Sequence, residues 1–138
     1  MDYFEINGLK KLNGIVNVSG AKNAVLPLMA AAILNKGSLK ISNVPTLSDS
    51  LTMSKLIEGM GGKVKFNRGN SILLDTSDLN KPFAPYDLVK TMRASFYVLG
   101  PLIARFGEAK VSLPGGCAWG PRPVDFHLNG LEELGVKI

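Results

Sequence analysis

Cysteine and histidine are scarce in this sequence, whose 138 residues contain one of each. A single cysteine excludes a framework of internal disulfides. The two residues also lie outside any CxxC or HxxxH pair, and such pairs are typical of structural zinc sites. We therefore expect neither a disulfide scaffold nor a bound metal.

Charge of one sign is not concentrated anywhere along the chain. Lys and Arg number 16 against 11 Asp and Glu, a formal net charge of +5, but the cations occur singly or in pairs. A protein that follows a nucleic-acid backbone needs a basic stripe or cluster, so we expect no nucleic-acid partner. Small anionic ligands fit this balance better.

Long apolar runs are missing as well. The apolar stretch at residues 24–34 is too short to span a bilayer. Two acids, Asp2 and Glu5, precede it, whereas a signal peptide begins with a basic region. We expect a cytoplasmic protein that does not associate with a membrane.

What the sequence does contain is an internal repeat with an offset of 74 residues. A composition of 46% apolar and 20% charged residues is that of a globular protein. A repeated supersecondary unit buries its apolar face against its neighbours, so an array of such units is expected. Without a gap, the match aligns residues 27–30 with 101–104, 36–39 with 110–113, and 57–64 with 131–138.

Periodicity and turn residues divide the first copy into β-α-β-α-β-β. Strands are predicted at residues 15–18 and 39–41, and an alanine-rich helix at 23–34. A second helix follows with Ser48 or Asp49 as N-cap and Gly61 as a left-handed C-cap. Residues 64–66 and 72–74 form a predicted hairpin that turns near residues 68–70. A phosphate-loop interpretation of residues 59–63 is rejected, because Gly61 recurs as Gly135.

The second copy is predicted to begin with one long helix that Asp87 caps and that reaches residue 106, with a kink at Gly100 and Pro101. A strand at residues 110–113, a loop at 114–122 and a helix at 123–134 follow. By repeat register, Ile138 falls inside the next strand. We therefore expect an incomplete α/β fold and only part of an enzyme.

The loop PGGCAWGPRP at residues 114–123 carries the strongest chemical signal. Its glycines leave the backbone on both sides of Cys117 free to move and keep the thiol accessible. Arg122 can support a thiolate or bind an anion, and Pro123 suits the first position of a helix, where the dipole favours phosphate. Alternatively, Cys117 is a small buried apolar residue in a turn.

Three further groups are candidate binding residues. Lys22 and Asn23, in SGAKN at residues 19–23, lie at a predicted helix N-terminus suited to phosphate, although a plain strand-to-helix turn with Asn23 as cap gives the same pattern. Arg93 and Tyr97 share a helix face that either binds a nucleotide or is merely solvated. His127 either contacts a ligand or is a half-buried polar residue.

Together, VSGAKN at residues 18–23, APYDLVKTMRAS at 84–95, and LPGGC with GPRPVDFH at 113–117 and 120–127 closely resemble the UDP-N-acetylglucosamine 1-carboxyvinyltransferase family. The resemblance covers the whole chain. It implies transfer of the enolpyruvyl group of phosphoenolpyruvate to the 3-hydroxyl of UDP-N-acetylglucosamine, with release of phosphate, as the first committed step of peptidoglycan synthesis. It implies no metal or other cofactor. The implied fold is an inside-out α/β barrel of β-α-β-α-β-β units.

The resemblance also implies a role for each matching residue. Cys117 is the proton donor to the methylene carbon and the thiol that the epoxide fosfomycin alkylates. Lys22 binds the phosphate of phosphoenolpyruvate, and Asn23 contacts the bound substrates. Arg93 helps to hold the nucleotide. The remaining site residues, which contact phosphate or the sugar nucleotide, are Arg122, Pro123, Val124, Asp125, Phe126 and His127.

The resemblance divides the chain as well. Residues 1–21 are expected to belong to a domain completed by the C-terminal part of the same enzyme, and residues 22–138 to an incomplete N-terminal substrate-binding barrel domain. Because the implied catalytic base lies beyond Ile138, we expect the chain alone to be inactive. Two departures, Trp119 and Tyr97, leave the chemistry unchanged. The alternatives are a non-catalytic anion-binding or assembly module of this fold, and a 3-phosphoshikimate 1-carboxyvinyltransferase.

Overall fold

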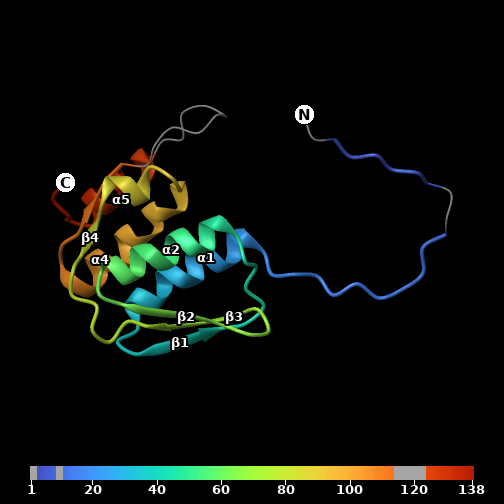
Figure 1. The fold of residues 1–138 in the computed structure, drawn as a ribbon. Helices are drawn as coiled ribbons and strands as arrows, with labels where there is room; N and C mark the ends of the chain where they lie inside the picture. The colour runs from blue at the N-terminus through green and yellow to red at the C-terminus, as the bar shows by residue number, and fades with distance from the viewer. Residues whose placement is uncertain (1–2, 9–10, 114–123) are drawn as a thin grey trace.

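The computed structural model describes residues 3–8, 11–113 and 124–138. In Figure 1, helices α1 (Lys22–Ala31) and α2 (Ser48–Gly59) lie side by side above a three-stranded sheet. The elements of the second copy cover the other side of these two helices, and residues 3–8 and 11–19 extend away from the body. The two central helices are therefore packed between a sheet and a second helical layer.

The sheet is antiparallel, with the strand order β1 (Ser38–Ile41), β3 (Ser71–Asp75), β2 (Lys63–Asn67). Ile72 and Leu74 of the central strand are fully buried against the helices, whereas Leu73 between them is 37% exposed. This alternation is typical of an antiparallel sheet with one wet face. The hairpin predicted for β2 and β3 is confirmed, and Gly69 and Asn70 at its turn both have positive φ.

The helices of the first copy form where the sequence predicts them, but their first residues differ from the predicted caps. The 3₁₀ segment η1 (Ala32–Leu34) extends α1 to the predicted end. The N-cap of α2 is Leu47, so Ser48 is its first helical residue and Asp49 lies in its first turn. The predicted N-caps, Ser48 or Asp49 for α2, are therefore wrong. An acidic side chain in a first turn is nevertheless stabilised by the helix dipole.

The 74-residue repeat is visible in the ends of two helices. Gly61 after α2 has φ +100° and Gly135 after α5 (Asp125–Glu133) has φ +90°, a conformation that glycine adopts without strain. Two backbone hydrogen bonds close each end in the pattern of a Schellman motif. After α2, the backbone N–H of Gly61 donates to the carbonyl oxygen of Glu58 at 2.9 Å, and that of Gly62 to Ile57 at 3.0 Å. After α5, the N–H of Gly135 donates to the carbonyl oxygen of Glu132 at 2.8 Å, and that of Val136 to Leu131 at 3.0 Å.

The long helix predicted for residues 87–106 is divided into three pieces. They are α3 (Tyr86–Val89), the 3₁₀ helix η2 (Arg93–Val98) and α4 (Leu99–Phe106). Helical structure is interrupted at residues 90–92, where no break is predicted, and the helix changes from 3₁₀ to α between Val98 and Leu99, just before the predicted kink at Gly100 and Pro101. Pro101 is the third residue of α4, where the N–H that it lacks would have no partner within the helix.

Two other details of the second copy differ from expectation. Pro85, and not Asp87, is the N-cap of α3. Asp87 instead accepts a hydrogen bond from Lys90 at 2.6 Å, which lowers the pKa of the carboxyl group and raises that of the ammonium group. Strand β5 (Lys110–Val111) confirms the start of the strand predicted at residues 110–113, whereas its parallel partner β4 (Phe83–Ala84) was not predicted.

Arg105 of α4 joins the second copy to the first. Its guanidinium group donates to the carbonyl oxygens of Ile33 at 2.9 Å and Thr76 at 2.8 Å. The buried Thr76 hydroxyl also donates to the carbonyl oxygen of Ala32, the first residue of η1, at 3.0 Å. The Ile33 carbonyl lies at the C-terminal end of the helical segment formed by α1 and η1, where a cation is favourable.

The strand predicted at residues 15–18 does not form. This segment is extended but pairs with no strand among the residues that the structure describes. Ile15, Val16 and Val18 are each more than 80% exposed. Alternating apolar residues form a strand only when a neighbouring strand accepts their backbone hydrogen bonds, so the pattern alone did not decide the outcome.

Candidate functional site

The site begins at the turn that enters α1. Gly20 donates its N–H to the Asn43 side chain at 3.0 Å, and a Cβ atom at Gly20 would lie 1.8 Å from the Asn43 carbonyl oxygen. Only glycine fits there, as expected for a close backbone approach, although the approaching group is the backbone of residue 43. This contact sets where α1 starts. The N-cap is Ala21, so the alternative that Asn23 caps the helix is wrong.

Lys22 is the first residue of α1, and its ammonium group pairs with an acid from the neighbouring helix. The Lys22 Nζ atom lies 2.8 Å from Oδ2 of Asp49, in the first turn of α2. The Lys22 side chain is 47% exposed and that of Asp49 is 27% exposed. Lys22 therefore remains accessible to a ligand while one of its donors is engaged.

Arg93 and Tyr97 approach α1 from η2. They lie in a 3₁₀ helix and not in the α-helix from which their shared face was predicted. Both nevertheless line the same pocket as Lys22 and Asn23, and Tyr97 is 49% exposed. The prediction that Arg93 and Tyr97 face one ligand requires a shared pocket, and both residues line it.

The third wall comes from residues around the start of α5. Val124, the N-cap of this helix, is buried, and His127 packs edge-on against the Phe96 ring with 6.0 Å between the ring centroids. Asp125 and Phe126 do not line the pocket. Phe126 is 83% exposed and lines a separate apolar groove with His127.

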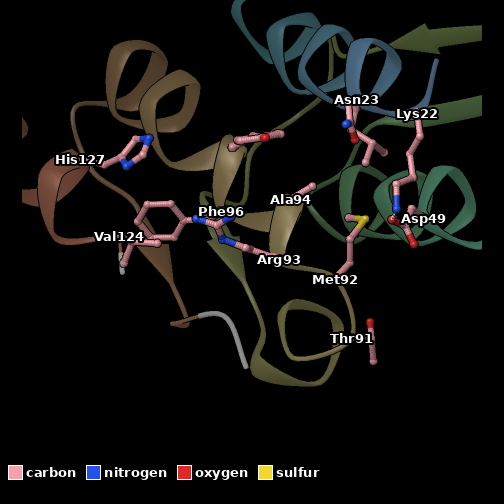
Figure 2. A pocket seen from close by; sticks show the side chains of 12 residues that line it. Lys22, Asn23, Asp49, Thr91, Met92, Arg93, Ala94, Phe96, Val124 and His127 are labelled. Atoms are coloured by element: carbon pink, nitrogen blue, oxygen red, sulfur yellow. Dashed lines mark ion pairs between the residues drawn. The ribbon is translucent and has the colours of Figure 1, made fainter. Parts of the chain in front are cut away.

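These three walls enclose a pocket of about 390 Å³, which Figure 2 shows from close by. Two of its side chains are cationic, Lys22 and Arg93, and one, Asp49, is anionic. A pocket of this size, with convergent polar groups over an apolar wall, is suited to a small anionic ligand. Its other lining residues are Asn23, Leu26, Thr91, Met92, Ala94, Phe96, Tyr97, Val124 and His127.

Cys117, Arg122 and Pro123 lie outside the described residues. Their predicted roles remain predictions. Val124, the first described residue after them, lines the pocket. Val124 therefore lies in the same pocket as Lys22 and Arg93.

Neither a metal-binding cluster nor a membrane-spanning helix is found among the described residues. Within residues 3–8, 11–113 and 124–138, no group of three or more His, Cys, Asp or Glu side chains is placed to hold a metal ion. No helix in the described part of the chain combines the length and the apolar character needed to cross a membrane.

Comparison with known proteins gives the pocket a context. Residues 6–138 match the family model described as EPSP synthase (3-phosphoshikimate 1-carboxyvinyltransferase). The chain belongs to this family. The mixture of helices and strands in the described residues fits an α/β fragment of this family's fold.

Individual relatives are more specific. The chain is 53% identical to the UDP-N-acetylglucosamine 1-carboxyvinyltransferases of Campylobacter hominis and Dichelobacter nodosus, and 54% identical to that of Yersinia pestis. Each match covers all of this chain and 33% of the relative. The chain thus spans about a third of the length of these EPSP synthase family members.

A solved structure supports the fold. The enolpyruvyl transferase NikO from Streptomyces tendae superposes with a TM-score of 0.64 and 26% identity, over 71% of this chain and 23% of that one. The expected α/β fragment of the enolpyruvyl transferase fold is therefore confirmed.

Sequence reasoning missed part of the pocket. Asp49 was considered only as a helix cap, and Thr91, Met92 and Phe96 were not considered as site residues. Asp49 is 27 positions from Lys22, so only the packing of α1 against α2 reveals the pair. Phe96 lies on η2, three residues after Arg93. Its aromatic side chain close to a predicted binding arginine was the one signal in the sequence that Phe96 belongs to the site.

Proposed function

We propose that the protein to which this chain belongs transfers the enolpyruvyl group of phosphoenolpyruvate to the 3-hydroxyl of UDP-N-acetylglucosamine and releases phosphate. The observation that carries the proposal is the pocket, which gathers Lys22, Asn23, Arg93 and His127 from three separate segments. Three relatives at 53–54% identity bear the name of this activity.

Within this proposal, the residues divide the chemistry between them. Cys117 protonates the methylene carbon of phosphoenolpyruvate, which leaves the adjacent carbon cationic and open to attack by the sugar hydroxyl. Lys22 and Arg122 bind the phosphate, and Asn23 contacts both substrates. Fixed cations in a site that excludes water stabilise the charge that develops there.

The nucleotide of the sugar substrate occupies the other side of the pocket. Arg93 helps to hold the nucleotide, while the segment Arg122, Pro123, Val124, Asp125 and Phe126 contacts the uridine diphosphate, and His127 is a further substrate-binding residue. The placement of Val124 and His127 on the pocket wall supports this arrangement. Asp125 and Phe126 do not line the pocket, so their contribution requires the substrate or the rest of the protein.

The same proposal covers the organisation of the chain. Residues 1–21 pack in a domain that the rest of the protein completes, and residues 22–138 form part of a substrate-binding barrel domain. The exposure of Ile15, Val16 and Val18 supports this division, because apolar side chains are stable when a partner covers them. The chain alone is then inactive, since the catalytic base lies in the remaining part.

The cellular role follows from the reaction. The protein acts in the cytoplasm on two small substrates, without nucleic acid or membrane, and commits UDP-N-acetylglucosamine to peptidoglycan. The protein is therefore needed for cell-wall biogenesis, and through the wall for cell shape, cell division and the cell cycle. The thiol of Cys117 makes the protein a target of fosfomycin.

Shikimate 3-phosphate is a second candidate acceptor, because the description of the matching family model names it. The experiment is to incubate the full-length protein with phosphoenolpyruvate and one acceptor at a time, and to measure phosphate release. We expect release with UDP-N-acetylglucosamine. Release with shikimate 3-phosphate alone would refute the proposal, and a protein that binds both substrates without release would be a non-catalytic module.

A further inference from the structure

Asp49 is the acidic member of a pocket that otherwise favours anions. Its Oδ2 atom lies 2.8 Å from Lys22 Nζ, and its Oδ1 atom accepts a hydrogen bond from the Ser48 hydroxyl at 3.4 Å. Figure 2 shows the Asp49 and Lys22 side chains meeting at one end of the pocket. Both carboxylate oxygens therefore have a partner.

The backbone holds this carboxylate more firmly than it holds the lysine. Asp49 has a short side chain in the first turn of a 12-residue helix, where the dipole favours its negative charge. Lys22 is a long side chain whose ammonium group has three donors. One donor is directed to Asp49, which leaves two for a ligand and restricts the rotation of the stem.

We propose that Asp49 is a positioning residue, which holds the Lys22 ammonium group against the pocket so that it meets the phosphate of phosphoenolpyruvate. This role rests on the proposed function. It predicts that loss of the Asp49 charge weakens the binding of phosphoenolpyruvate, because the lysine must then be ordered when the ligand binds.

The opposite effect would follow if Asp49 merely competed with the ligand. A carboxylate beside a phosphate site repels the phosphate, so its removal would then tighten the binding of phosphoenolpyruvate. The sign of the change therefore separates the two roles. A purely structural role of Asp49 would change stability and leave the Michaelis constants as they are.

The test compares the full-length protein with three variants in the phosphate-release assay. Asp49→Asn keeps the shape and removes the charge, whereas Asp49→Glu keeps the charge. Asp78→Asn is the matched control, because Asp78 pairs with Lys63 at 2.7 Å and neither residue lines the pocket. Urea unfolding of each variant reports on stability.

We expect Asp49→Asn to raise the KM for phosphoenolpyruvate about tenfold, as for the loss of a hydrogen bond between charged groups. The KM for UDP-N-acetylglucosamine and the unfolding midpoint should match those of Asp78→Asn, and Asp49→Glu should recover most of the affinity. An unchanged or lower KM for phosphoenolpyruvate in Asp49→Asn would overturn the proposal.

Equal impairment of the Asn and Glu variants would overturn it too, because the effect would then depend on shape and not on charge. If the unaltered protein releases phosphate and Asp49→Asn behaves like Asp78→Asn, this role alone fails. If the unaltered protein releases no phosphate with either acceptor, the proposed function fails, and this role with it.

Discussion

The turn before α1 offers the sharpest prediction, since a single methyl group should displace the start of the helix. The Cβ atom of a Gly20→Ala variant would lie 1.8 Å from the Asn43 carbonyl oxygen, whereas real Cβ contacts essentially never fall below 3.0 Å. The backbone must therefore separate by more than about 1 Å, a strain of about 1–3 kcal/mol by analogy with overpacked cores. The separation also strains the hydrogen bond from the Gly20 N–H to the Asn43 side chain.

The displacement should reach the chemistry, because Lys22 follows Gly20 by two residues. A misplacement of about 1 Å at a reacting group can reduce activity about 100-fold. The assay is kcat/KM for phosphoenolpyruvate in the full-length protein, at a temperature where circular dichroism shows that the variant is folded. Gly59→Ala is the matched control, because nothing lies within 4 Å of a Cβ atom there. Equal activity and stability of the two variants would refute the reasoning.

Two further predictions concern stability. Arg105→Met removes the donor to the Ile33 and Thr76 carbonyl groups and should lower the free energy of unfolding by about 2–3 kcal/mol in urea titrations; a loss below about 0.5 kcal/mol would contradict this account. Asp75 has a lowered pKa because the Ser77 N–H and hydroxyl group donate to it. Because the pKa of Asp75 is lower in the folded protein than in the unfolded chain, its carboxylate stabilises the fold at pH values above the unfolded pKa. This stabilisation is lost as the pH falls through the folded pKa. Ser77→Ala should therefore be less stable than the unaltered protein at neutral pH and equally stable once the pH lies below the pKa of Asp75 in the folded protein; a difference that persists after Asp75 is protonated would argue against this linkage.

The sequence was most informative where a feature repeats. Gly61 and Gly135 recur at the offset of 74 residues and end their helices with the same hydrogen bonds, so the repeat and the first copy could be predicted in detail. The hairpin of β2 and β3 was also predictable, because Gly69 and Asn70 favour the left-handed backbone of its turn. In each case local chemistry and tertiary packing favour the same structure.

The sequence was least informative where packing overrides local preference. No glycine or proline marks the break at residues 90–92, and burial of Met92 and Ser95 accompanies the change from α-helix to 3₁₀ helix. Strand β4, which was not predicted, has two residues, too few for a periodic pattern. The strand predicted at residues 15–18 does not form, although its alternating pattern is clear. No strand in the described structure pairs with it.

The candidate site shows the same division. Lys22, Asn23, Arg93 and His127 are candidates from their places on predicted helices and from the resemblance of their motifs to a known family, and the fold brings all four to one pocket. Asp49 belongs to no such motif. Its part in the pocket depends on the packing of α1 against α2, which residue order does not reveal.

The central claim is that this pocket binds the phosphate-bearing substrates. The most direct test is a crystal structure of the full-length protein, with Cys117→Ala to prevent turnover, bound to phosphoenolpyruvate and UDP-N-acetylglucosamine. We predict a phosphate oxygen of phosphoenolpyruvate within about 3 Å of Lys22 Nζ and the nucleotide beside Arg93. Substrates bound elsewhere, with Lys22 and Arg93 free of both, would contradict the account.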